Sequence, residues 1–399
     1  MGWKNEMSCE LRASSFEYYR AGSSRPRSSF PSAPRHSQLA NRGFTLTELL
    51  VVITIIAILA SLITAGAVNA LNAAKRGRIS LEINQLGQSM EEFKNRYNAY
   101  PPNGMNDGTN VLAINDFVRS FRKAFPRHQE HENLIRALAG ANLTSATGEP
   151  SLLDGGMTSA EAIYFWLGGF SEDPLFPLSG PGGPAFDPST TAGEVLESRN
   201  RIYEFDLGRL GPRNDAGVFN ATDLPNPGPG RFITYVNPLS TGGPRLRINL
   251  WTYNPSGSQQ PYIYFDASRH DPVDYDLNLA GTDVQLNRNA NSSLKSDYLN
   301  SDLEFIFGIK KVREGKANAV NPQDIVYVNK GKFQILHCGL DDAWGAEMPA
   351  SATDRKGFWA FNTDQFGVNV NVFPTGPFTG DIADTLTNFT PGTLESAQE

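Results

Sequence analysis

The stretch RGFTLTELLVVITIIAILASLITAGAVNAL, residues 42–71, decides the fold of this 399-residue chain. Residues 49–74 carry no charged side chain and are mostly Leu, Ile, Val and Ala. A helix of about 20 apolar residues spans the hydrocarbon core of a bilayer, whereas the apolar part of a secretory signal peptide needs only about 7–15. The run is therefore long enough to remain in the mature protein as a membrane anchor.

The charges on either side of this run predict its orientation. Residues 1–43 contain seven Lys/Arg and three Asp/Glu. The 356 residues that follow contain 28 Lys/Arg and 39 Asp/Glu. A basic flank stays in the cytoplasm, so we expect the acidic remainder to lie outside it. The net charge of −7 excludes a generally basic nucleic-acid binder.

A cleaved signal peptide is the alternative, because Ala65-Gly66-Ala67 has the small-residue pattern of a signal-peptidase site. Two features oppose it. The apolar run is too long, and Glu48 places a carboxylate at its start, where a signal peptide has basic or apolar residues.

The residues directly before the run, Arg42-Gly43-Phe44-Thr45-Leu46-Thr47-Glu48, resemble the class III signal of type IV prepilins and type II secretion pseudopilins. The resemblance implies that a membrane-embedded prepilin peptidase cuts after Gly43 and methylates the new N-terminus at Phe44. It also implies assembly with other pilin or pseudopilin subunits on an inner-membrane platform, with the head in the periplasm.

Glu48 is the fifth residue of the implied mature chain. A carboxylate at the edge of the hydrocarbon costs a few kcal/mol unless it finds a partner. The ammonium group of Phe44 on a neighbouring subunit would be such a partner and would fix the axial register of assembly. The alternative is that Glu48 only reaches the lipid headgroups.

The helix is predicted to continue beyond the membrane to residue 99. Apolar residues recur at intervals of four and three, which places them on one helix face: Ile79, Ile83, Leu86, Met90, Phe93 and Tyr97. We therefore divide the chain into a leader (1–43), a helix (44–100, with a transmembrane part 44–70 and an amphipathic spine 71–99) and an extracytoplasmic head (101–399).

The head is predicted to contain short helices followed by strands. Helices are expected at 116–124, 130–139 and 159–167, the last with Ser159 as N-cap. Strands are expected at 201–205, 231–236, 246–251, 261–265, 325–328 and 332–336, and loops at 179–188 and 226–230. This order predicts an α+β, pilin-like fold with large insertions, in which the long helix packs on an antiparallel sheet.

A second, weaker resemblance lies near the C-terminus. FQILHCGLDDAWG (333–345) and DTLTNF (384–389) are similar to the segments that flank the calcium loop of the major type II secretion pseudopilin. This implies Ca²⁺ ligands at Asp341, Asp342 and Asp384, since calcium takes oxygen ligands. Thr385 departs from the pattern, and an ordinary polar turn is the alternative.

Other motifs give little support for catalysis. Asp274, Asp276 and Asn278 copy the start of an EF-hand loop, but Leu279 stands where the glycine is required. The stretch HQEHE (128–132) is not a metalloprotease motif and is expected to be a solvated charged helix face. The chain is therefore expected not to be an enzyme.

The predicted function is that of a pseudopilin-like structural subunit of a type II secretion pseudopilus or type IV pilus-like filament. One alternative is an anchored binding module for polysaccharide or export cargo, which the aromatic content of 11% would allow. A second alternative is an anchored enzyme whose site has no recognised motif. Assembly into filaments through the helix would separate the subunit from both alternatives.

Overall fold

The computed structural model describes thirteen parts of the chain, and these belong to two compact units, residues 1–62 and 63–399. The described residues are 44–102, 111–141, 143, 156–188, 199–211, 231–236, 245–258, 260–268, 308–315, 325–343, 373–376, 378 and 380–398. The predicted leader 1–43, the loop 226–230 and the EF-hand-like segment 274–278 lie outside them.

Helix α1 extends over Leu46–Tyr97, which is 52 residues. Among the described residues it is the helix that is long and apolar enough to cross a membrane. It ends where Asn98 adopts a left-handed conformation with φ of 59°, which Asn tolerates better than most residues. Tyr100-Pro101-Pro102 then prevents its continuation.

The predicted apolar face of the spine packs against the protein's own head. Ile83, Leu86 and Met90 are completely buried, whereas Leu81 on the opposite face is 59% exposed. Phe93 lies 5.7 Å from Trp166 of the head between ring centroids. This burial confirms the prediction that the stripe forms part of the core of the head.

Three helices follow α1 in the head: α2 (Val111–Ala124), α3 (Glu132–Leu138) and α4 (Ser159–Leu167). All nine residues of α4 are buried, which makes it a central helix of the head. Its N-cap is Thr158 rather than the predicted Ser159. The Thr158 hydroxyl and the Glu161 carboxylate each accept the other residue's backbone N–H, an arrangement that satisfies two amides at the start of the helix.

The strands pair in the antiparallel sense throughout the described residues. One sheet has the order β1-β4-β3, and another has the order β10-β9-β6. The strands of these two sheets are β1 (Ala185–Phe186), β3 (Arg231–Val236), β4 (Arg245–Leu250), β6 (Ile263–Asp266), β9 (Phe333–His337) and β10 (Leu386–Thr387). The C-terminal strand β10 therefore pairs with a strand from the centre of the head.

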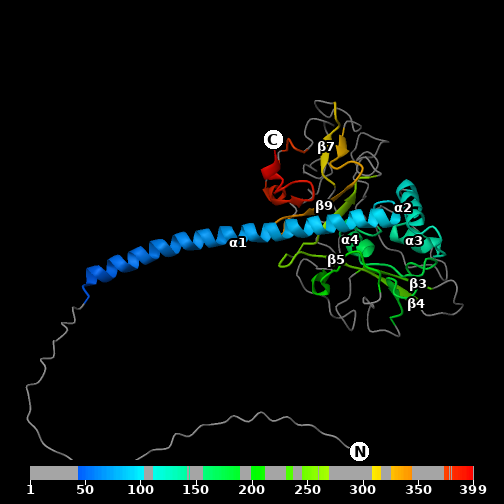
Figure 1. Cartoon of the computed structure of the whole chain (residues 1–399), viewed down its shortest axis with the longest axis horizontal. Coiled ribbons are helices and arrows are strands. Elements are labelled where there is room, and N and C mark those ends of the chain that lie inside the picture. Colours follow the sequence, from blue (N-terminus) through cyan, green and yellow to red (C-terminus); the bar gives the residue numbers. More distant parts are fainter. Residues whose placement is uncertain are drawn as a thin grey trace, which may run out of the picture. The chain divides into compact units, whose positions relative to one another are not determined.

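Two further pairs are β2 (Leu210–Gly211) with β5 (Thr252–Tyr253) and β7 (Lys310–Val312) with β8 (Ile325–Tyr327). The single predicted sheet is thus divided into smaller ones within the described part of the chain. Helix α4 packs on β5 and β6, and Figure 1 shows α2 and α3 beside the C-terminal end of α1. The α+β class with antiparallel strands is confirmed.

Two predictions of strand and loop positions were wrong. Residues 201–205 do not form a strand, because the N–H groups of Ile202 and Tyr203 donate to the Leu167 carbonyl at the end of α4 instead of to a neighbouring strand. Residues 179–188 are not all loop, since β1 lies within them and pairs with β4.

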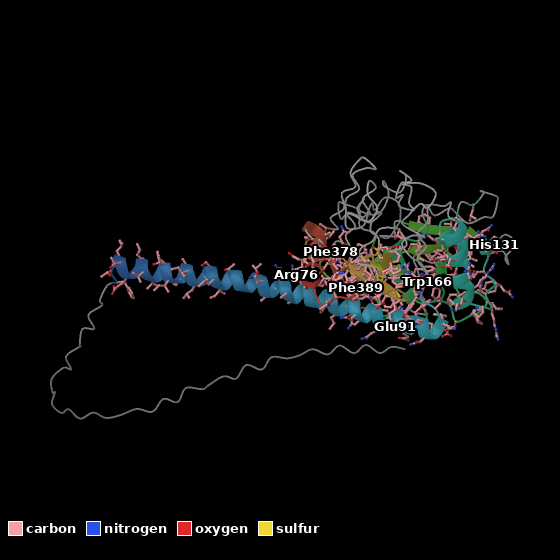
Figure 2. All side chains as sticks on the ribbon, turned by 90° about the horizontal axis from the view of Figure 1, so that it is seen from above. Arg76, Glu91, His131, Trp166, Phe378 and Phe389 are labelled. Atoms are coloured by element: carbon pink, nitrogen blue, oxygen red, sulfur yellow. The ribbon has the colours of Figure 1, made fainter. Side chains whose placement is uncertain are left out.

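The core is centred on Trp166 of α4, which lies among densely packed side chains (Figure 2). Its ring centroid is 5.8 Å from those of both Phe117 and Phe170. The indole N–H donates to the Pro102 carbonyl at 3.0 Å, so the polar atom of this buried ring is satisfied. The segment that follows α1 is thereby attached to α4.

Candidate processing and assembly site

The N-terminus of α1 is closed by a capping box formed by Thr45 and Glu48. The Glu48 N–H donates to Thr45 Oγ1 at 3.2 Å, and the Thr45 N–H donates to Glu48 Oε2 at 2.9 Å. The Thr45 hydroxyl also donates to Glu48 Oε2, at 2.9 Å. This reciprocal pattern starts the helix abruptly, so Phe44 lies outside it.

The capping box is compatible with cleavage between Gly43 and Phe44. Thr45 remains joined to Phe44 by a peptide bond in the mature chain, so its N–H is still an amide donor to Glu48. Phe44 is 80% exposed, and Gly43 lies outside the described residues. The roles of Gly43, Phe44 and Glu48 in processing, methylation and assembly stay predictions.

Glu48 retains capacity for a second partner. Both bonds from Thr45 go to Oε2, and within the described part of the chain no group donates to Oε1. A carboxylate has about four acceptor positions over its two oxygens. An ammonium group from another chain could therefore bind Glu48 without breaking the cap.

The apolar part of α1 presents large hydrophobic side chains to its surroundings, for example Ile58 and Leu62. Two of its hydroxyl groups are satisfied within the helix. The hydroxyl of Thr54 donates to the Leu50 carbonyl at 2.6 Å, and that of Ser61 donates to the Ile58 carbonyl at 2.8 Å. Such internal bonding suits a lipid environment, where no water replaces a missing partner.

Comparison with known proteins agrees with this geometry. Residues 39–64 match the family model described as the prokaryotic N-terminal methylation motif. The chain therefore carries the hallmark of prepilin-type proteins, the type IV pilins and pseudopilins. This motif and the long apolar helix fit a membrane-anchored, structural pilin-like subunit. No curated protein and no solved structure matches the chain significantly.

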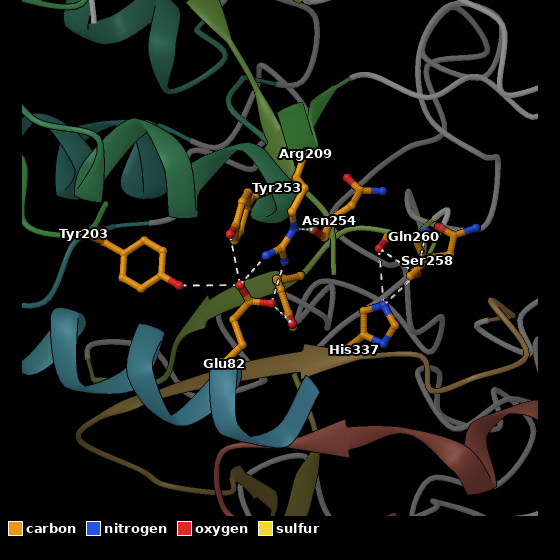
Figure 3. A network of polar contacts seen from close by, with 9 residues as sticks. Glu82, Tyr203, Arg209, Tyr253, Asn254, Ser258, Gln260 and His337 are labelled. Carbon is orange, nitrogen blue, oxygen red and sulfur yellow. Dashed lines mark hydrogen bonds and ion pairs between the residues drawn. The ribbon is translucent and has the colours of Figure 1, made fainter. Parts of the chain in front are cut away.

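The site that the sequence analysis missed is a buried polar network around Glu82 (Figure 3). Glu82 lies on α1 and is 9% exposed. Arg209 donates from Nη1 to Oε1 at 2.8 Å and from Nη2 to Oε2 at 2.6 Å, a bidentate ion pair. The hydroxyls of Tyr253 and Tyr262 donate to the same carboxylate at 2.9 and 2.6 Å.

This network fixes the spine helix to three separate segments of the head. Arg209 ends the short 3₁₀ helix η1 (Leu207–Arg209), Tyr253 belongs to β5, and Tyr262 precedes β6. Arg209 also donates from Nε to the Asn254 carbonyl at 2.8 Å. The rotation and axial position of α1 relative to these segments are therefore specified by directional bonds as well as by packing.

The charge state of Glu82 follows from two opposing effects. Burial raises the pKa of this carboxyl group, but the hydrogen bonds and charge of Arg209 and the tyrosine hydroxyls outweigh burial and lower the pKa overall. The pKa values of Tyr253 and Tyr262 are raised, mainly by burial and then by the adjacent carboxylate. Glu82 is therefore held ionised and the tyrosines are held as donors.

A signal for Glu82 was present in the sequence. Glu82 follows Ile79 by three residues and precedes Leu86 by four, so it belongs to the apolar face and not to the polar one. A charged residue at such a position requires a buried partner. The partner Arg209 could not be identified from the sequence, because nothing in the spacing connects it to α1.

Asp384, one of the three predicted calcium ligands, has protein partners for both oxygens. Oδ1 forms an ion pair with Arg76 Nη2 at 2.7 Å, and Oδ2 accepts the Leu340 N–H at 2.7 Å. Arg76 lies on α1, and Figure 2 labels it near the C-terminal segment. Thr385, which departs from the calcium pattern, is fully buried.

The other two predicted ligands also make local hydrogen bonds. Asp341 Oδ1 accepts the Ala343 N–H at 3.1 Å, and Asp342 accepts a hydrogen bond from the Ser258 hydroxyl. Among the described residues, Asp342 forms a group of three potential metal ligands with His337 and Cys338. Calcium binding by Asp341, Asp342 and Asp384 stays a prediction.

The HQEHE stretch is not the solvated helix face that the sequence analysis expected. His131 is the N-cap of α3, where its Nδ1 accepts the Asn133 N–H at 3.2 Å. Glu130 is buried and accepts the backbone N–H groups of Leu178 and Ser179 at 2.7 and 2.8 Å. Burial raises the pKa of Glu130 despite these bonds. Its role is to anchor the segment before β1.

Proposed function

We propose that the chain is a prepilin-type structural subunit that is cleaved after Gly43, methylated at Phe44 and polymerised through α1. The assembly would be a type II secretion pseudopilus or a type IV pilus-like filament. The observation that carries this proposal is the methylation motif at residues 39–64, located at the start of a helix that is apolar first and then buried in a head.

The proposed partners follow from the same segment. Prepilin peptidase would act on the Gly43–Phe44 bond, and an inner-membrane assembly platform would take up the mature subunit. Helix α1 begins at Leu46 after the cap at Thr45, so Phe44, on one side of the scissile bond, lies outside the helix and is 80% exposed. Exposed segments outside regular structure are preferred sites of proteolysis, so the position of Phe44 supports cleavage next to it.

The distribution of aromatic residues gives little support to the alternative of a polysaccharide-binding module. Stacking on sugars requires exposed rings, whereas Trp166, Tyr253 and Tyr262 are among the most buried side chains of the described residues. These three side chains are buried in the hydrophobic core of the head. In the part of the chain that the structure describes, these large aromatic side chains are therefore used for packing.

The test is mass spectrometry of the N-terminus, with and without prepilin peptidase, in a bacterium that expresses the chain. The proposal requires a mature protein that begins with N-methylated Phe44 and that crosslinks to other subunits through cysteines introduced near Glu48. A mature protein that begins at or after Val68 would show signal-peptide cleavage and would refute the proposal.

A further inference from the structure

Side chains with metal-binding atoms converge at the C-terminal end of β9. His337, Cys338 and Asp342 each offer one ligand atom, and these three atoms lie within 4.8 Å of one another. The Cys338 sulfur is 4.0 Å from His337 Nε2. His337 and Cys338 are completely buried, while Asp342 is half-buried and therefore lies on the side from which an ion could enter.

The backbone brings these residues together by a tight reversal after the strand. Gly339 has a φ of 110° and Asp342 a φ of 55°, so the chain turns twice in the left-handed region within four residues. Ser258, from the connection between β5 and β6, completes the group. Its Oγ lies 3.0 Å from His337 Nε2 and donates to Asp342 Oδ1.

The donor set is one imidazole nitrogen, one sulfur and two oxygens. Zinc takes four such ligands in a tetrahedron at about 2.0–2.3 Å, which places neighbouring ligand atoms about 3.3–3.6 Å apart. From His337 Nε2, the Ser258 Oγ at 3.0 Å is closer than that spacing and the Cys338 sulfur at 4.0 Å is farther. Ser258 Oγ is also hydrogen-bonded to Asp342 Oδ1, so the Ser258 side chain must move away from both atoms to admit an ion. A thiolate with an imidazole selects a softer ion than calcium, which takes oxygen ligands.

We propose that His337, Cys338 and Asp342, with the Ser258 hydroxyl, form a structural Zn²⁺ site that ties the β5–β6 connection to the end of β9. Binding converts the Cys338 thiol to a thiolate and releases one proton to solvent. It also requires a change of tautomer at His337, because Nδ1 accepts the Gly339 N–H at 3.1 Å and Nε2 therefore carries the ring proton, facing the Gln260 carbonyl at 3.2 Å.

In the metal-bound form the ring proton moves to Nδ1, and the bond from the Gly339 N–H is lost. The peptide of Gly339 must therefore rotate away, which a glycine can do at little conformational cost. Zinc binding in small protein sites is strong enough to drive such local rearrangement. The site would differ from the predicted calcium site in chemistry and in three of its four donor residues.

The experiment uses the full-length chain in detergent and Co²⁺ as a spectroscopic substitute for Zn²⁺. A tetrahedral site with a cysteine ligand gives d–d bands and a thiolate-to-cobalt charge-transfer band, both lost when Zn²⁺ displaces the cobalt. We expect one ion per chain and no displacement by Ca²⁺. The absence of a charge-transfer band in the folded chain would overturn the proposal.

Matched variants assign the ligands. Cys338→Ser should abolish the charge-transfer band. Cys9→Ser, which changes the only other cysteine and is made in the uncleaved chain that still carries residues 1–43, should leave the band intact. Ser258→Ala removes one of the four donors and should weaken Zn²⁺ affinity by at least about 10–100-fold, the range for residues that only orient the ligands. Circular dichroism verifies the fold of each variant. A band that persists in folded Cys338→Ser, or that disappears in Cys9→Ser, would refute the assignment.

Discussion

Replacement of Glu82 by Leu tests whether the buried ion pair holds the spine helix in the head. The substitution leaves the Arg209 guanidinium without its counter-charge and removes the acceptor of the Tyr253 and Tyr262 hydroxyls. Loss of one partner of a buried pair costs about 3–5 kcal/mol. Because the side chains of Glu82 and Arg209 are 12% and 20% exposed, we expect a loss of about 3 kcal/mol in the free energy of unfolding.

The assay is urea unfolding of the full-length chain in detergent, followed by the near-ultraviolet circular dichroism of the tyrosines. Glu92→Leu is the matched control, since Glu92 is an exposed carboxylate on the same helix, and its effect should stay within about 0.5 kcal/mol. The double variant Glu82→Leu/Arg209→Met should recover part of the loss, because it removes both buried charges. Equal stability of Glu82→Leu and Glu92→Leu would refute the reasoning.

The same network predicts a pH dependence. The pKa of Glu82 is lower in the folded chain than its ordinary value. The folded state therefore binds this proton less readily than the unfolded state, and the stabilisation is fully present above the ordinary Glu pKa of about 4.3. This stabilisation is lost as the pH falls below about 4.3 and through the lower pKa that Glu82 has in the folded chain. Over that interval, stability should fall less steeply with acidification in Glu82→Leu than in the wild type.

Three further predictions concern processing, assembly and calcium. A bulky substitution of Gly43 should cause uncleaved precursor to accumulate, as immunoblots would show; normal cleavage would contradict the assigned site. Glu48→Val should leave membrane insertion and cleavage intact but reduce crosslinking between neighbouring α1 helices, because an unmatched ammonium in low dielectric costs about 3–5 kcal/mol, or roughly 10²–10³-fold or more per subunit added. Equal crosslinking in the wild type and in Glu48→Val would refute the role of Glu48 in assembly and leave only its hydrogen bonds with Thr45 at the start of α1. If Asp341, Asp342 and Asp384 bind Ca²⁺, millimolar Ca²⁺ should raise the melting temperature relative to chelator; an unchanged value would remove the site.

The parts of the fold that the sequence predicted correctly are those governed by local periodicity. The intervals of four and three from Ile79 to Phe93 identified the buried face of α1, because a helix places such positions on one side. The apolar run after Glu48 identified the candidate membrane helix in the same way. Both features depend on residues that are close in the sequence.

The errors arose where a distant partner decides the outcome. Residues 201–205 have the composition of a strand, yet the carbonyl of Leu167 takes their N–H groups. The role of Glu82 could not be predicted from the sequence, because its partner Arg209 lies far along the chain. Propensity is a weak prior that such tertiary contacts override.

The ion pair between Arg76 and Asp384 has a consequence for the biogenesis of the head. Arg76 follows the apolar run closely and is synthesised early, whereas Asp384 lies far along the chain and is synthesised much later. The Leu394 N–H donates to the Thr385 carbonyl at 3.0 Å, so the final segment also closes on itself at this point. Contacts of such high sequence separation are slow to form, because the entropy of closing a long loop opposes them. A chain truncated before residue 384 therefore loses both the ion pair to Arg76 and the acceptor of the Leu340 N–H, so nothing at this point joins the segment after β9 to α1 through Asp384.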